Sequence, residues 1–135
     1  MASSRLMVID TSALIAILKV EAEATALLTC LSRPGDKLIS TATLLETRIV
    51  LDRQLGEAGE SALDLLLRKG GISPLNLELQ HVEWALLGWR RFGKGNHPAG
   101  LNLGDCFSYG LAMALSAPLL FKGNDFPATD VTPAL

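Results

Sequence analysis

Short apolar runs alternate with amphipathic stretches along most of this chain. Runs of strand type occupy residues 6–9, 37–40, 72–75 and 118–121. The first run, Leu-Met-Val-Ile, is apolar at every position, which is typical of a strand that is buried on both faces of a parallel sheet. Pro74 lies in the third run, and proline has no backbone N–H to donate. We therefore expect that strand at an edge of the sheet, or proline at its first position.

The spacing of apolar residues between these runs predicts helices. They are expected over residues 11–18, 21–31, from 41–43 to 55, 60–69, 78–92 and 105–116. Thr11 or Ser12 is expected to cap the first helix, Gly70-Gly71 to stop the fourth, and Asp130-Val131 to begin a last edge strand. The alternation predicts the α/β class, as one domain over residues 1–135: a three-layer α/β/α sandwich with a central, mainly parallel sheet.

Composition adds expectations about surface and location. Hydrophobic residues make up 49% of the 135 positions and aromatic residues only 5%, and the mean hydropathy is +0.32. A value this high suggests an apolar surface that is used by a partner. No apolar run approaches the ~18 residues of a membrane helix, and Asp10 interrupts the one nearest the N-terminus. We expect a cytoplasmic protein that does not enter a membrane, with Cys30 and Cys106 as buried thiols.

Four acidic residues stand where strands end or helices begin: Asp10, Glu46, Asp105 and Asp125. Each has a plain structural alternative. Asp10 and Asp105 are suited to capping their helices, and Asp125 follows Gly-Asn as a turn residue would. Glu46 stands three residues after Thr43, the spacing of a capping box. Taken singly, none of these residues identifies a site.

Their joint placement favours a site. The carboxyl ends of parallel strands and the starts of the helices that follow lie at one edge of a sheet, so all four acids are expected to converge there. Crowded carboxylates raise one another's pKa unless a cation neutralises them. Oxygen ligands without His or Cys suit Mg²⁺ or Mn²⁺, and such ions cleave phosphodiesters with a metal-activated water. The formal charge of −2 does not itself indicate nucleic-acid binding. If several acids are gathered around a metal ion, however, the surface around them is more basic than the net charge suggests.

These residues also carry a family likeness that spans nearly the whole chain. The chain resembles the PIN-domain ribonucleases, in particular the VapC-type toxins of toxin–antitoxin pairs. The segments that carry the resemblance are Val8–Ala13, Ile39–Ser40, Thr43–Glu46, Phe92–Ala99, Leu101–Cys106 and Leu120–Phe126. They occur in the order of the family.

The resemblance implies a divalent-metal-dependent endoribonuclease that cleaves structured RNA, of the tRNA or rRNA class. It also implies a cognate antitoxin and a homodimer. On this basis Asp10 and Asp105 carry the principal metal, and Glu46 and Asp125 complete its shell. Thr11 and Ser12 are expected to hold Asp10 or a water molecule, with Asn124 as a weaker candidate for the same supporting role.

The remaining polar and aromatic candidates are less specific. Arg90, Arg91 and Lys94 flank the irregular stretch 93–100 and are expected to contact RNA phosphates, although a solvated helix face explains them as well. His97 is expected to fix that stretch. Trp84 and Trp89 fit a core or a dimer contact better than a platform for bases.

Two alternatives from other functional classes remain open. A receiver-like signalling module also gathers acids around Mg²⁺ at strand ends, but it needs adjacent acids after the first strand, where this chain has one. A non-catalytic PIN-like scaffold would use the same acids only as caps. Binding of Mn²⁺ separates the scaffold from the nuclease.

Overall fold

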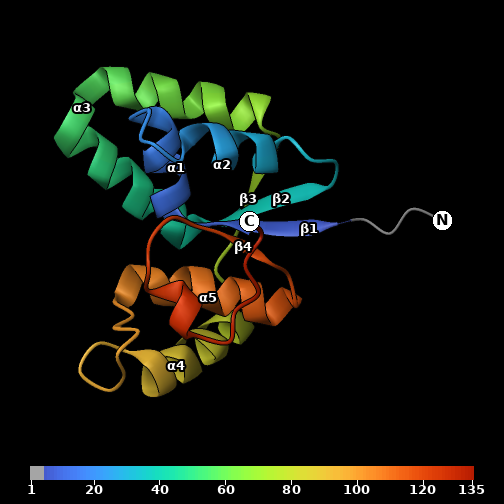
Figure 1. Ribbon diagram of the computed structural model, residues 1–135, viewed down its shortest axis with the longest axis vertical. Coiled ribbons are helices and arrows are strands. Elements are labelled where there is room, and N and C mark those ends of the chain that lie inside the picture. The colour runs from blue at the N-terminus through green and yellow to red at the C-terminus, as the bar shows by residue number, and fades with distance from the viewer. Residues whose placement is uncertain (1–4) are drawn as a thin grey trace.

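A parallel sheet forms the centre of the computed structural model, which describes residues 5–135 (Figure 1). The strand order is β3-β2-β1-β4, and every pair of neighbours is parallel. The strands are β1 (Leu6–Ile9), β2 (Asp36–Ser40), β3 (Ile72–Leu75) and β4 (Leu119–Leu120). Pro74 lies on β3, which is an edge strand, as predicted. Residues 1–4 of the predicted domain lie outside the described part of the chain.

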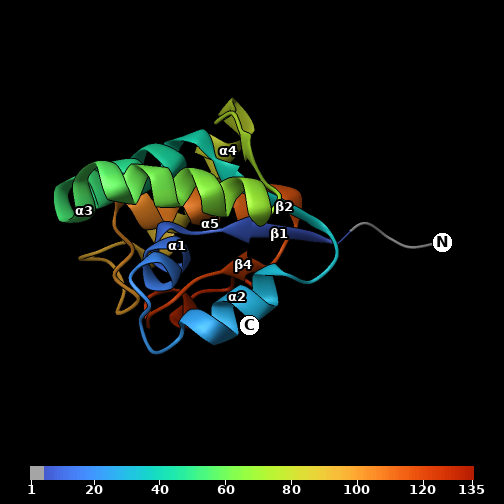
Figure 2. The ribbon, with the colours of Figure 1, turned by 90° about the horizontal axis from the view of Figure 1, so that it is seen from above.

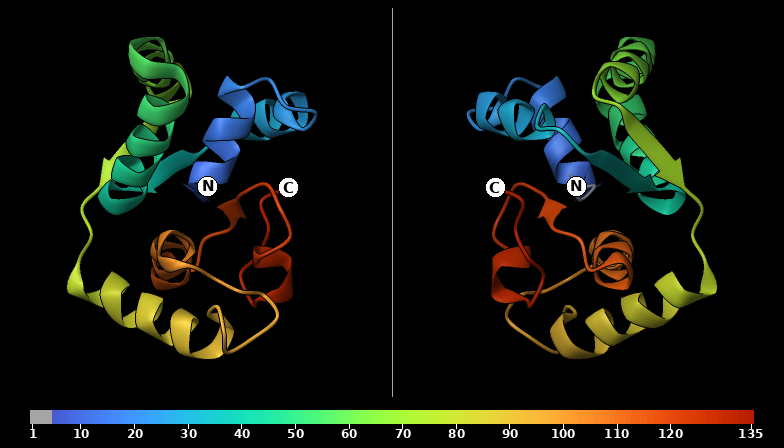
Figure 3. Two further views of the ribbon diagram at one scale, coloured as in Figure 1. Left: turned by 90° about the vertical axis from the view of Figure 1, so that its left-hand side faces the viewer. Right: turned by 90° about the vertical axis from the view of Figure 1, so that its right-hand side faces the viewer.

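Helices cover both faces of this sheet, which confirms the predicted three layers (Figures 1 and 3). The helices on one face are α1 (Thr11–Leu18), α2 (Ala24–Leu31) and α3 (Thr41–Lys69). Those on the other face are α4 (Leu79–Phe92) and α5 (Leu103–Leu115). Seen from above, α3 lies across the sheet with α1 and α2 beside it (Figure 2).

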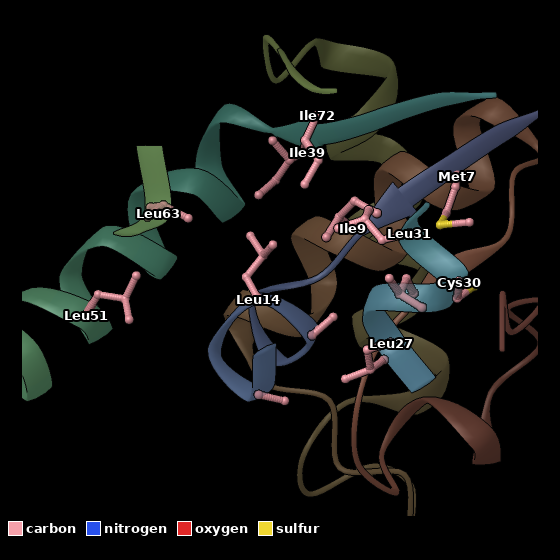
Figure 4. Close-up of a cluster of buried hydrophobic side chains, with 13 residues drawn as sticks. Met7, Ile9, Leu14, Leu27, Cys30, Leu31, Ile39, Leu51, Leu63 and Ile72 are labelled. Carbon is pink, nitrogen blue, oxygen red and sulfur yellow. The ribbon is translucent and has the colours of Figure 1, made fainter. Parts of the chain in front are cut away.

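Two apolar cores, one on each side of the sheet, explain the uninterrupted apolar run of β1. Met7 and Ile9 point into the core under α1, α2 and α3 (Figure 4), whereas Val8 points into the core under α4 and α5. In β4, Leu120 and Leu119 divide between the same two cores. Successive side chains of a strand point to opposite faces, so a sheet covered on both faces needs apolar residues at every position.

The helix α3 joins two segments that the sequence predicts as separate helices. Gly56 interrupts it with φ 60° and ψ −143°, a backbone conformation that favours glycine. The two halves therefore meet at an angle rather than forming one straight rod (Figure 1). Arg48 and Glu60 form an exposed ion pair across the bend. The predicted break near residue 56 is confirmed.

The C-terminal segment differs from the prediction. The expected last strand from Asp130-Val131 is reduced to one bridge between Leu119 and Pro133, after a short 3₁₀ helix, η1 (Phe126–Ala128). The two hydrogen bonds of this bridge run from the N–H of Leu119 to the carbonyl of Thr132 at 2.8 Å and from the N–H of Ala134 to the carbonyl of Leu119 at 2.9 Å. Among the described residues, no helix combines the length and the apolar character needed to cross a membrane.

Candidate active site

The structure brings the four candidate acids to the carboxyl edge of the sheet. Asp10 directly follows β1 and precedes α1, and Glu46 lies in the second turn of α3. Asp105 lies in the first turn of α5, and Asp125 stands between β4 and η1. The left panel of Figure 3 looks onto this edge, where the starts of α1, α3 and α5 meet the segment that follows β4.

Asp10 is buried, with only 3% of its surface exposed, and it accepts three hydrogen bonds. Its Oδ2 accepts from the backbone N–H of Ser12 at 3.0 Å and from Ser12 Oγ at 2.6 Å. Its Oδ1 accepts from Ser108 Oγ at 2.5 Å. Asp10 is thus the N-cap of α1, and the expectation that Thr11 or Ser12 would cap this helix is wrong. The aspartate is favoured because its side chain reaches back to the N2 amide from the extended backbone that ends β1.

Glu46 is not part of a capping box. The cap of α3 is Ser40, whose Oγ accepts from the N–H of Ala42 at 3.2 Å. Glu46 instead accepts a hydrogen bond from Thr11 Oγ1 at 2.7 Å. A Cβ atom at position 104 would overlap the Glu46 carboxylate, so glycine at the start of α5 leaves the room that this carboxylate occupies.

Asp105 belongs to a capping box, but as its third helical residue rather than as the N-cap. The helix α5 begins at Leu103, two residues earlier than predicted, because Asn102 caps it. Asn102 Oδ1 accepts from the Asp105 N–H at 2.9 Å, and Asp105 Oδ2 accepts from the Asn102 N–H at 3.1 Å. Asp125, by contrast, is exposed and makes no side-chain bond to cap η1. Its neighbour Asn124 is also exposed.

The carboxylates influence one another electrostatically. Burial raises the pKa of Asp105 to about 7, the hydrogen bond from Asn102 opposes the shift, and the charges of Asp10, Asp125 and Glu46 add to it. Burial also raises the pKa of Glu46, the bond from Thr11 opposes this, and the charge of Asp10 adds to it. The four acids therefore share one electrostatic environment, although they come from four distant segments.

The donor set fits a hard divalent cation. All four groups are carboxylates, and crowded carboxylates with raised pKa values are stabilised by a cation. Within residues 5–135, no three His, Cys, Asp or Glu side chains are placed around one point to hold an ion as they stand. The carboxylate of Asp105 is turned back to its own helix start. Coordination by both oxygens of Asp105 would therefore require that carboxylate to release the N–H of Asn102.

Sequence reasoning missed a set of buried hydroxyl groups behind these acids. Thr47 Oγ1 lies 2.9 Å from Thr11 Oγ1, and Thr43 Oγ1 lies 3.4 Å from Ser108 Oγ. Thr43, Thr47 and Ser108 are each fully buried. A signal existed for Ser108, which stands three residues after Asp105 on the same helical face within a largely apolar helix.

The basic candidates lie at the end of α4 and in the stretch that follows. Arg91 pairs with Asp130 at 3.2 Å, whereas Arg90 and Lys94 are exposed. His97 fixes the stretch 93–100, as expected: its Nδ1 accepts from the Ala99 N–H at 3.0 Å, and its ring packs edge-on against Phe92.

Comparison with known proteins identifies the family. A PIN domain model matches residues 7–131. A Ribonuclease VapC from Mycolicibacterium smegmatis is 47% identical over 93% of this chain and 97% of that protein. Ribonuclease VapC30 from Mycobacterium tuberculosis is 45% identical over 93% of this chain and 95% of that protein. The chain belongs to the VapC ribonucleases of the PIN-domain family.

Solved structures support the same fold. The crystal structure of Mycobacterium tuberculosis VapC20, a sarcin–ricin loop cleaving toxin, aligns with a TM-score of 0.73 at 17% identity, over 93% of this chain and 96% of that one. VapBC2 from Rickettsia felis, bound to a promoter DNA fragment, aligns with a TM-score of 0.74 at 16% identity, over 95% and 96%. The family excludes the receiver-like alternative and makes this chain a toxin–antitoxin ribonuclease.

Proposed function

We propose that this ribonuclease is a divalent-metal-dependent toxin that cuts structured RNA at the carboxyl edge of its sheet. The proposal depends on one observation: Asp10, Glu46, Asp105 and Asp125 come from four distant segments to the carboxyl edge of the sheet, close enough that, besides burial, the other three charges raise the pKa of Asp105. The similarity to VapC20, described as a sarcin–ricin loop cleaving toxin, supports a structured ribosomal or transfer RNA as substrate.

Asp10 and Asp105 would hold the principal Mg²⁺ or Mn²⁺, and Glu46 and Asp125 would complete its surroundings. A bound divalent ion polarises the phosphate and provides an activated water at neutral pH. The protein's own contribution is to fix the carboxylates: Ser12 hydrogen-bonds Asp10, and Thr11 hydrogen-bonds Glu46. Asn124 was also expected to help hold Asp10 or a water molecule. Among the described residues it makes no such contact, so this role stays a prediction.

The RNA backbone would approach from the end of α4. Arg90 and Lys94 are exposed there, close in sequence to the start of α5 that carries Asp105. Phosphate contacts of this kind are electrostatic and independent of base sequence. Arg91 is engaged by Asp130, so its contribution would require that exposed pair to open.

Protein partners are also part of the proposal. The solved VapBC complex from Rickettsia felis and a toxin–antitoxin complex from Klebsiella pneumoniae support an antitoxin partner. An exposed apolar stripe on α4 supports contact with a protein, including a second copy of the chain. It consists of Leu79, Val82, Leu86 and Trp89, and the last three of these line a groove of about 560 Å³ between α4 and α5. Light scattering on wild type and Leu86→Glu tests the homodimer, which is wrong if wild type is monomeric at micromolar concentration.

Cleavage of a structured RNA with defined metal content tests the activity. We expect cuts in the presence of Mg²⁺ or Mn²⁺, none in EDTA, and recovery when the ion is restored in excess. Cleavage that persists in EDTA would contradict the metal dependence. Isothermal titration with Mn²⁺ separates the non-catalytic scaffold, because acids that only cap helices bind no ion.

A further inference from the structure

Both oxygens of the Asp10 carboxylate accept hydrogen bonds, and the donors belong to two different helices. Ser12, its neighbour in α1, donates to Oδ2 from its amide and its hydroxyl, at 3.0 and 2.6 Å. Ser108, from α5, donates to Oδ1 at 2.5 Å across 98 positions of sequence. Each of these three donors therefore has a carboxylate oxygen as its acceptor. With donors on both oxygens, rotation of the carboxylate about its Cβ–Cγ bond breaks at least one hydrogen bond.

Ser108 links the carboxylate of Asp10 to the helix that carries Asp105. It is fully buried in α5, and it stands three residues after Asp105, so both side chains lie on one face of the helix. A serine inside a helix commonly bonds a carbonyl of the preceding turn. Here the hydroxyl hydrogen-bonds the carboxylate of another element, while Thr43 Oγ1 lies 3.4 Å behind it.

We propose that Ser108 is a positioning residue, which fixes the orientation in which Asp10 presents its free lone pairs to a divalent cation. This rests on the proposed function, since it concerns the same metal site. Carboxylates that bind metal are themselves hydrogen-bonded, and loss of such a bond costs about ten- to hundredfold in metal affinity or activity. Ser108 does not touch the ion or the RNA in this proposal; it acts through Asp10 alone.

Isothermal titration of the metal-free full chain with Mn²⁺ tests this. We expect Ser108→Ala to weaken Mn²⁺ binding about tenfold, because Asp10 loses one of its anchors. Ser108→Thr, which keeps the hydroxyl, should retain affinity within about threefold, well inside the loss that such anchors cause. If the Ala and Thr variants lose affinity equally, packing rather than the hydroxyl is responsible, and the proposal is wrong.

A control variant separates positioning from general stability. Ala112 is buried one helical turn further along α5, and Ala112→Gly weakens the helix without touching a carboxylate. This variant should bind Mn²⁺ as wild type does, even where its melting temperature falls as far as that of Ser108→Ala. Equal losses of affinity in Ala112→Gly and Ser108→Ala would overturn the positioning role.

The variant Asp10→Asn separates the metal site itself from the positioning role of Ser108. If Asp10→Asn loses Mn²⁺ binding while Ser108→Ala binds as wild type does, the metal site stands and the role of Ser108 is wrong. If Asp10→Asn itself binds Mn²⁺ as tightly as wild type, the metal site at Asp10 is wrong, and the role of Ser108 falls with it.

Discussion

The candidate site has two halves that are held in different ways. Asp10 and Glu46, the anchored pair, accept hydrogen bonds from hydroxyls: Asp10 from Ser12 of its own helix start and from Ser108 of α5, and Glu46 from Thr11 of α1. The second half is the open pair, Asp105 and Asp125. Asp105 bonds only to the start of its own helix, and Asp125 is exposed.

The anchored pair is therefore preorganised for an ion, whereas the open pair adjusts when the ion binds. The anchored pair is fixed by the fold before any ion arrives, because its hydroxyl donors come from packed helices. The open pair has no such donors from other helices, so we expect it to adapt more readily to an ion or to RNA. A site built this way lowers the cost of ordering on binding, since only two carboxylates need to be reoriented.

The largest expected effect is the loss of the central anchored acid. Asp10→Asn should reduce RNA cleavage by more than ~100-fold, beyond the range for residues that act only through a ligand. The melting temperature should change little, because asparagine also caps helices. Cleavage rates and thermal unfolding, measured on the same preparation, check both statements.

Asp125→Asn is the matched variant from the open pair. Because Asp125 is exposed and outside the hydroxyl network, its loss should reduce cleavage less than the loss of Asp10 does. Equal losses in the two variants would remove the distinction between an anchored and an open pair.

A methyl group at position 104 should disturb the anchored pair indirectly. The Cβ of Gly104→Ala would overlap the carboxylate of Glu46 and displace it. We expect cleavage to fall about ten- to hundredfold, as for other changes that misplace a metal ligand. In a Glu46→Ala background, the same change should cost nothing further, and the double-mutant cycle measures this coupling. Additive losses would show that residue 104 acts elsewhere.

The open pair should also make metal binding depend on pH. The pKa of Asp105 rises from 3.8 to about 7, chiefly through burial, so an ion must displace its proton below neutral pH. Mn²⁺ affinity should rise about tenfold per pH unit up to neutrality and then level off, which corresponds to one displaced proton. Titrations from pH 5 to 8 measure this slope, and Asp105→Asn should flatten it.

The same shift has a consequence for stability without metal. The folded protein binds the Asp105 proton more tightly than the unfolded chain does, because its folded pKa is raised. Stability therefore declines as pH rises from about 4 through about 7, where this proton is lost. The difference in melting temperature between wild type and Asp105→Asn isolates this contribution. A difference that is independent of pH would contradict the raised pKa.

The fold, and the placement of the four acids at one edge of the sheet, could be predicted because their signals are local. A four-residue apolar run, as in β1, needs only its own sequence to indicate a strand that is covered on both faces. Glycine at 56 likewise marks the bend in α3 from its own position. The sequence does not decide the caps of α1 and α5, because Asp, Asn, Ser and Thr compete for the same position: Asp10 caps α1 as one alternative had it, whereas Asn102 rather than Asp105 caps α5. The backbone conformation at the end of the preceding strand or loop decides which of these residues becomes the N-cap.

Most contacts of the hydroxyl network cannot be predicted from the sequence, because they join residues that are far apart in the chain. Ser108 meets Asp10 across 98 positions, and Thr11 meets Thr47 across 36. A serine or threonine in a helix looks the same in sequence whether it bonds its own backbone or a distant carboxylate. Only the packing of α1, α3 and α5 around the start of the first helix decides between these two roles.

The smallest expected effect concerns the tether of the segment that carries Asp125. The backbone N–H of Lys122 donates to Ser12 Oγ at 3.0 Å, and its ammonium group pairs with Glu21 at 2.6 Å. Lys122→Met removes the ion pair and keeps the backbone bond. Cleavage should fall by no more than about fivefold, because partly exposed ion pairs contribute little. Arg48→Met breaks an ion pair at the bend of α3 and should leave cleavage unchanged. A loss in Lys122→Met as large as that in Asp10→Asn would place Lys122 among the groups that hold the anchored pair.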